Sequence, residues 1–196
     1  MVKATKDNRP FSSGVFDLEE FNIYTKVIDL PLDGIPTYLE EGINGVCTGG
    51  SALFNVFSNK RRVVKNDLIT IFPYQLASIT EISTDFAVIF FKVPKKLFMD
   101  TINGLGRLTL DYFFYMRKYY SSPLSEEEYK RFVHFCHILS CRVDLSCAFL
   151  RRESVMYLLR VYYWDLYVGY KSNPKAMASV KFVRKEKQVL NSFIWL

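Results

Sequence analysis

The residues best suited to metal chemistry lie close together in the second half of the sequence. His134 and His137 are the only two histidines, and Cys141 follows them at helical spacing. Imidazole and thiolate groups bind zinc, so this set has some competence as a metal site. A structural zinc site needs a fourth ligand, and no motif supplies one. We therefore predict no metal site and no cofactor, and interpret the three side chains as packed or solvated.

Catalytic motifs are equally thin in this sequence. It has no GxSxG nucleophile elbow, no Walker loop and no GxGxxG fingerprint. The segment Gly104-Leu105-Gly106 follows a predicted helix rather than a strand and lacks a third glycine. A Ser–His–Asp or Cys–His site would have to use one of the two histidines, which have no catalytic signature beside them. We predict no catalytic residue and no enzymatic activity.

Aromatic residues of the first half are better candidates, because they could bind a small molecule. Ligand sites favour the mouths and interiors of β-barrels, where aromatic walls surround a few polar groups. The alternative is that these aromatic residues only fill a core, and the unknown strand parity leaves that alternative open. The candidate ligand-binding residues are Phe54, Asn55, Phe57, Phe72, Tyr74 and Gln75.

The elements that would carry these residues change type near residue 94. Residues 20–93 contain short runs of β-branched and aromatic residues, separated by Asp-Gly, Asn-Gly and Gly-Gly turns. Many short strands at even spacing are typical of a sandwich or barrel. Apolar residues then recur at helical spacing over residues 94–170. The pattern predicts an α+β chain in which a β-barrel is followed by helices.

Two of the predicted helices have specific signals. Ser125 and Glu128 form the Ser-x-x-Glu pattern of a capping box, which predicts a helix beginning there. Another helix, over about residues 148–170, is apolar on two faces and must be covered twice. We predict that one of its stripes forms the interface of a homodimer, with a fully buried central helix as the alternative. The predicted interface residues are Val155, Leu159, Tyr162 and Leu166.

The net charge of +6 is concentrated at the C-terminal end. Residues 171–196 contain six Lys and Arg against one Glu, whereas residues 1–170 contain 20 basic and 19 acidic residues. Such a segment is either a solvated helix face or a contact for a polyanion. The four cysteines have irregular spacing, no secretory signal is present, and no uncharged run is long enough to span a membrane. We expect a cytoplasmic protein with no membrane partner.

The order of these parts resembles a known family. Residues 50–57 and 64–75, the step at residues 83–86 into a last strand, and the helices after it are similar to the N-terminal sensing and dimerisation domain of AraC-type transcription regulators. Residues 184–190 resemble the segment that leads into the helix-turn-helix DNA-binding domain of that family. The resemblance covers about residues 20–196.

This resemblance implies a cupin-like β-barrel or jelly roll followed by a helical dimerisation part. It divides the chain into an N-terminal arm (1–19), a ligand-sensing barrel (20–93), a helical dimerisation part (94–170) and a linker helix (171–196). The linker would lead to a DNA-binding domain that this chain lacks, so DNA would be contacted only through that absent domain. A small-molecule effector in the barrel would bias how two subunits are arranged.

Two other classes remain open at this point. One is a cupin-type isomerase or lyase that works without a metal, using carboxylates, tyrosines or Cys47 in the barrel. Residues 1–133 contain no histidine, which excludes the histidine-ligated metal site of cupin enzymes. The other class is a nucleic-acid binder that uses Lys60-Arg61-Arg62 and the basic C-terminal segment. The non-catalytic regulator domain is the function that we predict.

Overall fold

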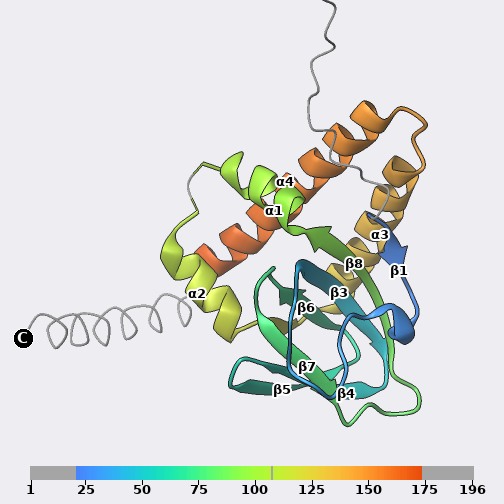
Figure 1. Cartoon of the computed structure of the whole chain (residues 1–196), viewed down its shortest axis with the longest axis vertical. Helices are drawn as coiled ribbons and strands as arrows, with labels where there is room; N and C mark the ends of the chain where they lie inside the picture. Colours follow the sequence, from blue (N-terminus) through green and yellow to red (C-terminus); the bar gives the residue numbers. More distant parts are fainter. Residues whose placement is uncertain (1–20, 107, 174–196) are drawn as a thin grey trace, which may run out of the picture.

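Strands fill the first half of the chain and helices most of the second (Figure 1). The structure is a computed structural model that describes residues 21–106 and 108–173. The predicted arm at 1–19, and the predicted linker helix apart from residues 171–173, lie outside the described residues. The strands are β1 (Ile23–Tyr24), β2 (Thr37–Tyr38), β3 (Glu41–Gly49), β4 (Ser51–Val56), β5 (Asn59–Val64), β6 (Asp67–Ile71), β7 (Leu76–Thr80), β8 (Ala87–Pro94) and β9 (Ser121–Pro123). The helices are the short 3-10 turn η2 (Val27–Asp29) and α1 (Lys95–Asn103), α2 (Leu110–Lys118), α3 (Glu126–Val143) and α4 (Ala148–Ser172).

The strands pair as one long hairpin that is rolled up on itself. In this nested pattern β1 pairs with β8, β2 with β7, β3 with β6 and β4 with β5, all antiparallel. Two further pairings, β3 with β8 and β4 with β7, complete two facing sheets of order β1-β8-β3-β6-β9 and β2-β7-β4-β5. This interleaved order is that of an eight-stranded jelly roll, the architecture of cupins, with β9 added at one edge. The predicted α+β class is confirmed.

The five-stranded sheet is covered on both faces. Along β6, Ile69 and Ile71 face the second sheet, whereas Leu68 and Thr70 face the helices. All five residues of β6 are buried, as expected for a strand that separates two packed layers. Figure 1 shows the helices gathered against this side of the strands. The molecule therefore has an inner core between the sheets and a junction core between the sheet and the helices.

Local sequence sets the turns and helix starts that build this arrangement. Gly50, with a φ of 61°, makes the turn from β3 to β4, where a side chain would bring Cβ to 2.5 Å from the backbone nitrogen of Phe86. Before α3, the Ser125 hydroxyl accepts a hydrogen bond from the Glu128 N–H, and the Glu128 carboxylate accepts one from the Ser125 N–H. The predicted capping box is present.

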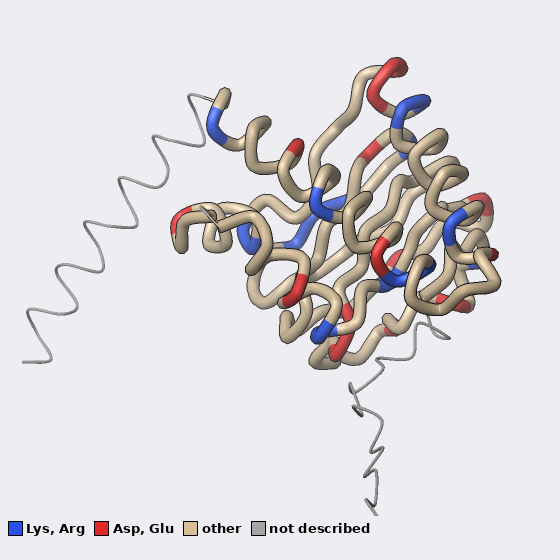
Figure 2. The backbone as a smooth tube through the Cα atoms, turned by 90° about the horizontal axis from the view of Figure 1, so that it is seen from above, with Lys and Arg blue, Asp and Glu red and all other residues tan. Residues whose placement is uncertain are grey.

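Charges of both signs are interspersed over the described backbone (Figure 2). Arg152 of α4 bridges to Asp100 of α1 at 2.6 Å and thereby links the two helices. Lys92 of β8 lies 3.4 Å from Glu41 of β3 on the neighbouring strand. The basic triplet at residues 60–62 belongs to β5, where Arg61 donates to the Ser121 carbonyl (3.2 Å) and Arg62 pairs with Glu81. These charges join elements of the fold to one another.

Candidate functional site

The six predicted ligand-binding residues do not lie together. Phe54 is fully buried between the two sheets, with its ring 6.3 Å from that of Phe86. Asn55, the next residue of β4, faces the opposite side, and its Oδ1 has no hydrogen-bond partner within residues 21–106 and 108–173. The other four, Phe57, Phe72, Tyr74 and Gln75, line one cleft outside the barrel.

The interior of the jelly roll is filled by its own side chains. Phe54 packs there as a core residue, as in the alternative left open from the sequence. The Tyr120 hydroxyl closes one side, donating between the carbonyl oxygens of Phe54 (2.9 Å) and Asn59 (3.0 Å). The aliphatic side chains of this interior, none more than 2% exposed, include Ile43, Ala52, Val56, Val63, Ile69, Ile71 and Ile79.

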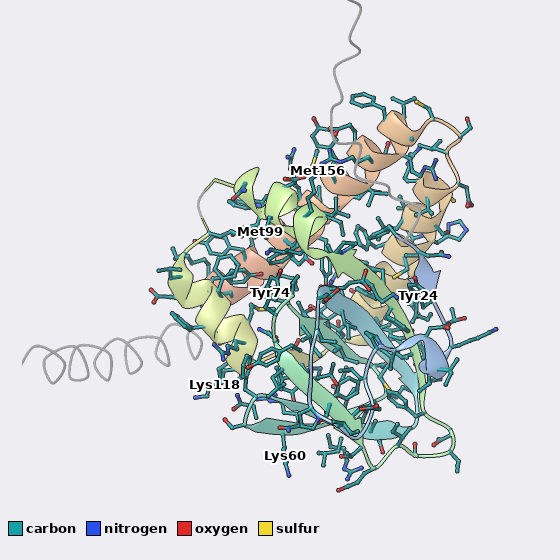
Figure 3. All side chains as sticks on the ribbon, viewed as in Figure 1. Tyr24, Lys60, Tyr74, Met99, Lys118 and Met156 are labelled. Carbon is teal, nitrogen blue, oxygen red and sulfur yellow. The ribbon has the colours of Figure 1, made fainter. Side chains whose placement is uncertain are left out.

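A cleft of about 230 Å³ lies where turns of the jelly roll meet α1 and α2. We call it the aromatic cleft, because six of its nine lining residues carry aromatic rings. Figure 3 labels Tyr74, one of these residues, at the level where the helices meet the strands. The strand side contributes Phe57, Phe72, Pro73, Tyr74 and Gln75, and the helix side contributes Phe98, Phe113, Phe114 and Arg117.

Strained backbone presents two of these rings. Phe57, in the turn after β4, has a φ of 53°, and Tyr74, in the turn before β7, has a φ of 62°. Residues other than glycine rarely adopt this left-handed region, because occupying it costs about 1–3 kcal/mol each. Backbone hydrogen bonds hold both turns, since Phe57 N–H donates to the Leu76 carbonyl (2.8 Å) and Tyr74 N–H to the Leu39 carbonyl (2.7 Å). The rings are thus fixed by their own turns.

The aromatic cleft has one buried acceptor and a cationic edge. Gln75 is only 6% exposed, and its Oε1 has no hydrogen-bond partner in the described part of the chain. The guanidinium carbon of Arg117 lies 3.4 Å from the centre of the Phe57 ring. On the outer side of Tyr74, the Lys95 ammonium lies 4.6 Å from the ring centre. The nine residues that line the cleft include no carboxylate.

The predicted interface stripe on α4 faces the interior of the same chain. Val155 and Leu159 are 0% exposed and Tyr162 is 8% exposed, because they pack in the junction core. Leu166, the fourth member, is partly buried against that core. This corrects the choice of stripe, since three of the four side chains are covered by their own α-helices and sheet. A second subunit would have to contact another face of α4.

Two adjacent tyrosines attach α4 to the sheet through buried polar residues that the sequence analysis missed. Asn44 of β3 donates from Nδ2 to the Tyr163 hydroxyl (3.1 Å), and Thr70 of β6 shares a hydrogen bond with the Tyr162 hydroxyl (3.1 Å). Asn44 and Thr70 are direct cross-strand partners, so the two bonds lie side by side. Burial raises the pKa of both tyrosines, which keeps their hydroxyls neutral. The sequence signal is weak: Thr70 is a polar residue between Ile69 and Ile71, and Asn44 is one that follows Ile43.

The outer face of α4 carries a row of exposed apolar side chains. Tyr157, Val161, Trp164 and Val168 are 59%, 58%, 41% and 45% exposed. Their spacings of four, three and four residues place them on one line along the helix. Leu150, which is also exposed, lies seven residues before Tyr157 and extends the line. We call these five residues the α4 stripe.

A larger groove of about 740 Å³ runs beside the same helix. It lies between α2, β9, α3 and α4, and Tyr162 and Leu166 are among its walls. The acidic residues Glu128 and Asp165 and the basic residue Arg131 also line it. The groove is continuous with the α4 stripe, because Val161 belongs to both.

The histidines and cysteines that the structure describes lie apart from the aromatic cleft. His134, His137 and Cys141 are exposed on α3, and the Cys141 sulfur lies 3.9 Å from Nδ1 of His137. Among the described residues, no group of three His, Cys, Asp or Glu side chains is placed to bind a metal ion. Burial is the main factor that raises the pKa of the Cys47 thiol, and it raises that of Tyr120 to about 12.

None of the described helices combines the length and the apolarity that a membrane crossing requires. No protein-family model matches the sequence, and no curated protein matches it.

Two solved structures are similar to the chain at 10% sequence identity. Apo ToxT K231A from Vibrio cholerae strain SCE256 aligns with a TM-score of 0.48, over 80% of this chain and 55% of that one. CuxR, described as an AraC-like transcriptional activator, aligns with a TM-score of 0.35, over 64% of this chain and 43% of that one. The chain therefore spans about half the length of the proteins it is similar to.

Proposed function

We propose that this chain is the ligand-sensing and dimerising domain of an AraC-type transcription regulator and that it catalyses no reaction. The proposal rests on the α4 stripe, combined with a jelly roll whose five-stranded sheet is covered by helices on one face. Contact with DNA belongs, on this proposal, to a helix-turn-helix domain outside the chain. Such a regulator acts where the DNA is, so the proposal includes a cytoplasmic location.

The α4 stripe supports dimerisation because its geometry suits a second copy of the same helix. Alternating steps of three and four residues are the repeat by which two helices pack along a shared seam. α4 has 25 residues and is therefore about 37 Å long, which is enough for several turns of contact. Exposed apolar rows of this kind mark interaction surfaces in soluble proteins. A two-fold axis would place the same stripe on both subunits.

A metal-free cupin-type enzyme is less well supported by the described residues. It would need ionisable groups in the barrel whose pKa lies near neutral pH. The Cys47 thiol, facing the barrel interior, has its pKa raised by burial, which disfavours the reactive thiolate. The Tyr120 hydroxyl is already hydrogen-bonded to two backbone carbonyls. Neither group is prepared for acid–base or nucleophilic work.

Sedimentation of the intact chain tests the dimer. We expect a dimer at micromolar concentration and a folded monomer after Val161→Glu or Trp164→Asp, because each change puts a charge on the seam. Ile82→Glu is the matched control, since Ile82 is also exposed but lies between β7 and β8, away from α4. A wild-type monomer, or a Val161→Glu variant that stays dimeric, would overturn the interface.

The regulatory role is tested separately with a reporter. The chain is fused to a DNA-binding domain that represses its operator only as a dimer. Repression that is lost on Val161→Glu and kept on Ile82→Glu would support a dimerising regulator domain. Equal repression by all three fusions would contradict it.

A further inference from the structure

We propose that the aromatic cleft binds a small aromatic acid, a single ring that carries a carboxylate and a hydrogen-bond donor such as a hydroxyl. This inference deepens the proposed sensing function by giving the effector a place and a chemical class. It moves the ligand from the filled interior of the jelly roll to the cleft between the jelly roll and the helices.

The size of the cleft limits its ligand to about one ring. An apolar cavity of roughly 150 Å³ holds a benzene molecule. The aromatic cleft, at about 230 Å³, has room for a ring and one or two small substituents. Its walls are aromatic rings packed against one another, since the ring centres of Phe72 and Phe98 lie 5.1 Å apart and those of Phe72 and Phe113 lie 5.8 Å apart, and they offer a further ring an aromatic surface to pack on.

Arg117 selects for a carboxylate on this ring. Its guanidinium carbon lies 3.4 Å from the centre of the Phe57 ring, and a guanidinium held against a ring in this way can still donate from its N–H groups. No ion pair joins Arg117 to a carboxylate within the described ranges. A planar carboxylate matches the paired N–H donors of an arginine edge.

Gln75 selects for a donor on the same ligand. Its Oε1 is buried and lacks a partner in residues 21–106 and 108–173, and a buried acceptor without a donor is costly. Gln75 lines the cleft, so a turn of its amide toward the cleft would bring this oxygen within reach of a ligand hydroxyl or amino group. A site built to hydrogen-bond a ligand group discriminates against analogues that lack it.

The strained turns give the site a rigid frame. Phe57 and Tyr74 hold their rings through left-handed backbone that hydrogen bonds fix, and such strain concentrates at functional sites. Phe72, on the floor of the cleft, lies 6.1 Å from the ring of Tyr163, which is bonded to Asn44 on the sheet. A bound ring would thus contact the same side chain against which α4 packs.

Calorimetric titration of the chain with 4-hydroxybenzoate tests the proposal. For a ligand of this size we expect a Kd on the order of 0.01–1 mM. Arg117→Gln should weaken binding by about 10-fold or more, because it removes a charge-assisted contact. Lys118→Gln is the matched control, since Lys118 is the next residue of α2 and does not line the cleft; it should bind like the wild type. p-Cresol, which lacks the carboxylate, should bind weakly to the wild type and to Arg117→Gln.

A second variant tests the role of Gln75. Gln75→Leu keeps the approximate volume and removes the acceptor, so 4-hydroxybenzoate should lose about 10-fold in affinity while benzoate is unaffected. No saturable binding up to about 10 mM, ten times the weakest Kd expected, would overturn the inference. Equal binding by the wild type and Arg117→Gln would also overturn it.

Sedimentation of the same samples separates this failure from that of the proposed function. A dimer that binds no aromatic acid would contradict the proposed ligand site and leave the proposed dimerisation standing. A monomer whose binding of the aromatic acid depends on Arg117 would contradict the proposed dimerisation and support the proposed ligand site.

Discussion

The two cores of this molecule are built from different kinds of side chain. The inner core, between the sheets, is mainly aliphatic, and its one tyrosine, Tyr120, has its hydroxyl bonded to two backbone carbonyls. The junction core, between the sheet and the helices, contains Tyr112, Tyr162, Tyr163, Tyr167 and Tyr170. Both the aromatic cleft and the larger groove border the junction core.

The difference indicates where this fold can adapt to a partner. Aliphatic side chains pack at crystal-like density and leave little to rearrange. Large rings pack edge to face across the junction, as Phe98 and Tyr163 do at 87°. The hydroxyls of the buried tyrosines there need hydrogen-bond partners, and not all of them have one among the described residues. Tyr112 is 0% exposed, and its hydroxyl has no partner among the described residues. The junction core therefore holds a buried hydroxyl without a partner among the described residues, whereas the Tyr120 hydroxyl of the inner core is bonded.

Truncating one ring in each core should give the largest difference between them. Phe54→Ala should lower the free energy of unfolding by about 3–5 kcal/mol, because the aliphatic inner core closes poorly around a cavity. Phe72→Ala should cost less, because Phe72 already borders the aromatic cleft and water can enter the space. Urea unfolding with linear extrapolation measures both. Equal losses would show that the two cores pack alike.

Removing one hydroxyl from each core should give a smaller effect of opposite character. Tyr120→Phe leaves the carbonyls of Phe54 and Asn59 without their donor and should cost about 1–3 kcal/mol. Tyr112→Phe removes a buried hydroxyl that has no partner among the described residues and should leave stability unchanged or raise it. The same urea experiment decides this. A loss on Tyr112→Phe as large as that on Tyr120→Phe would mean that the Tyr112 hydroxyl is satisfied after all.

The parts of the fold that follow from local chemistry could be predicted from the sequence. Strand content, turn positions and the start of α3 depend on neighbours in the chain, so the α+β class and the Ser125 capping box were accessible. The polar pairs Asn44–Tyr163 and Thr70–Tyr162 were not, since each joins residues about 90–120 positions apart. Such contacts depend on how the sheet and α4 are superimposed.

The candidate sites show the limits of periodicity even more clearly. Phe54 and Phe57 are three residues apart, so strand alternation places them on opposite faces; Phe54 is fully buried between the sheets, whereas Phe57 is partly buried against that core and lines the aromatic cleft. On α4, both faces are apolar, and spacing alone cannot tell the stripe of Val155 and Leu159 from that of Tyr157 and Val161. Only the position of the sheet decides which stripe is buried.

The smallest predicted effect concerns α3, which packs against the junction core through residues such as Phe132. Ser125→Ala removes the cap and should lower the free energy of unfolding by about 1 kcal/mol at neutral pH. If the junction core unfolds together with the inner core, tyrosine absorbance and far-ultraviolet circular dichroism will shift to the same lower urea midpoint with an unchanged slope. Separate midpoints would show that the helical layer unfolds by itself.

The pH dependence of this variant gives a second measurement of the same cap. Hydrogen bonds from the Ser125 N–H and hydroxyl hold the pKa of Glu128 below its usual value of 4.5. A carboxyl whose pKa is lower in the folded state stabilises that state above its unfolded pKa and loses the effect as pH falls through its folded pKa. The gap in stability between wild type and Ser125→Ala should therefore be constant above about pH 5 and shrink below about pH 4. The substitution keeps the backbone N–H that donates to Glu128, so part of the acid sensitivity should persist in the variant. A gap that is independent of pH down to acid unfolding would show that the hydroxyl acts only through the N–H of Glu128 and not through its carboxylate.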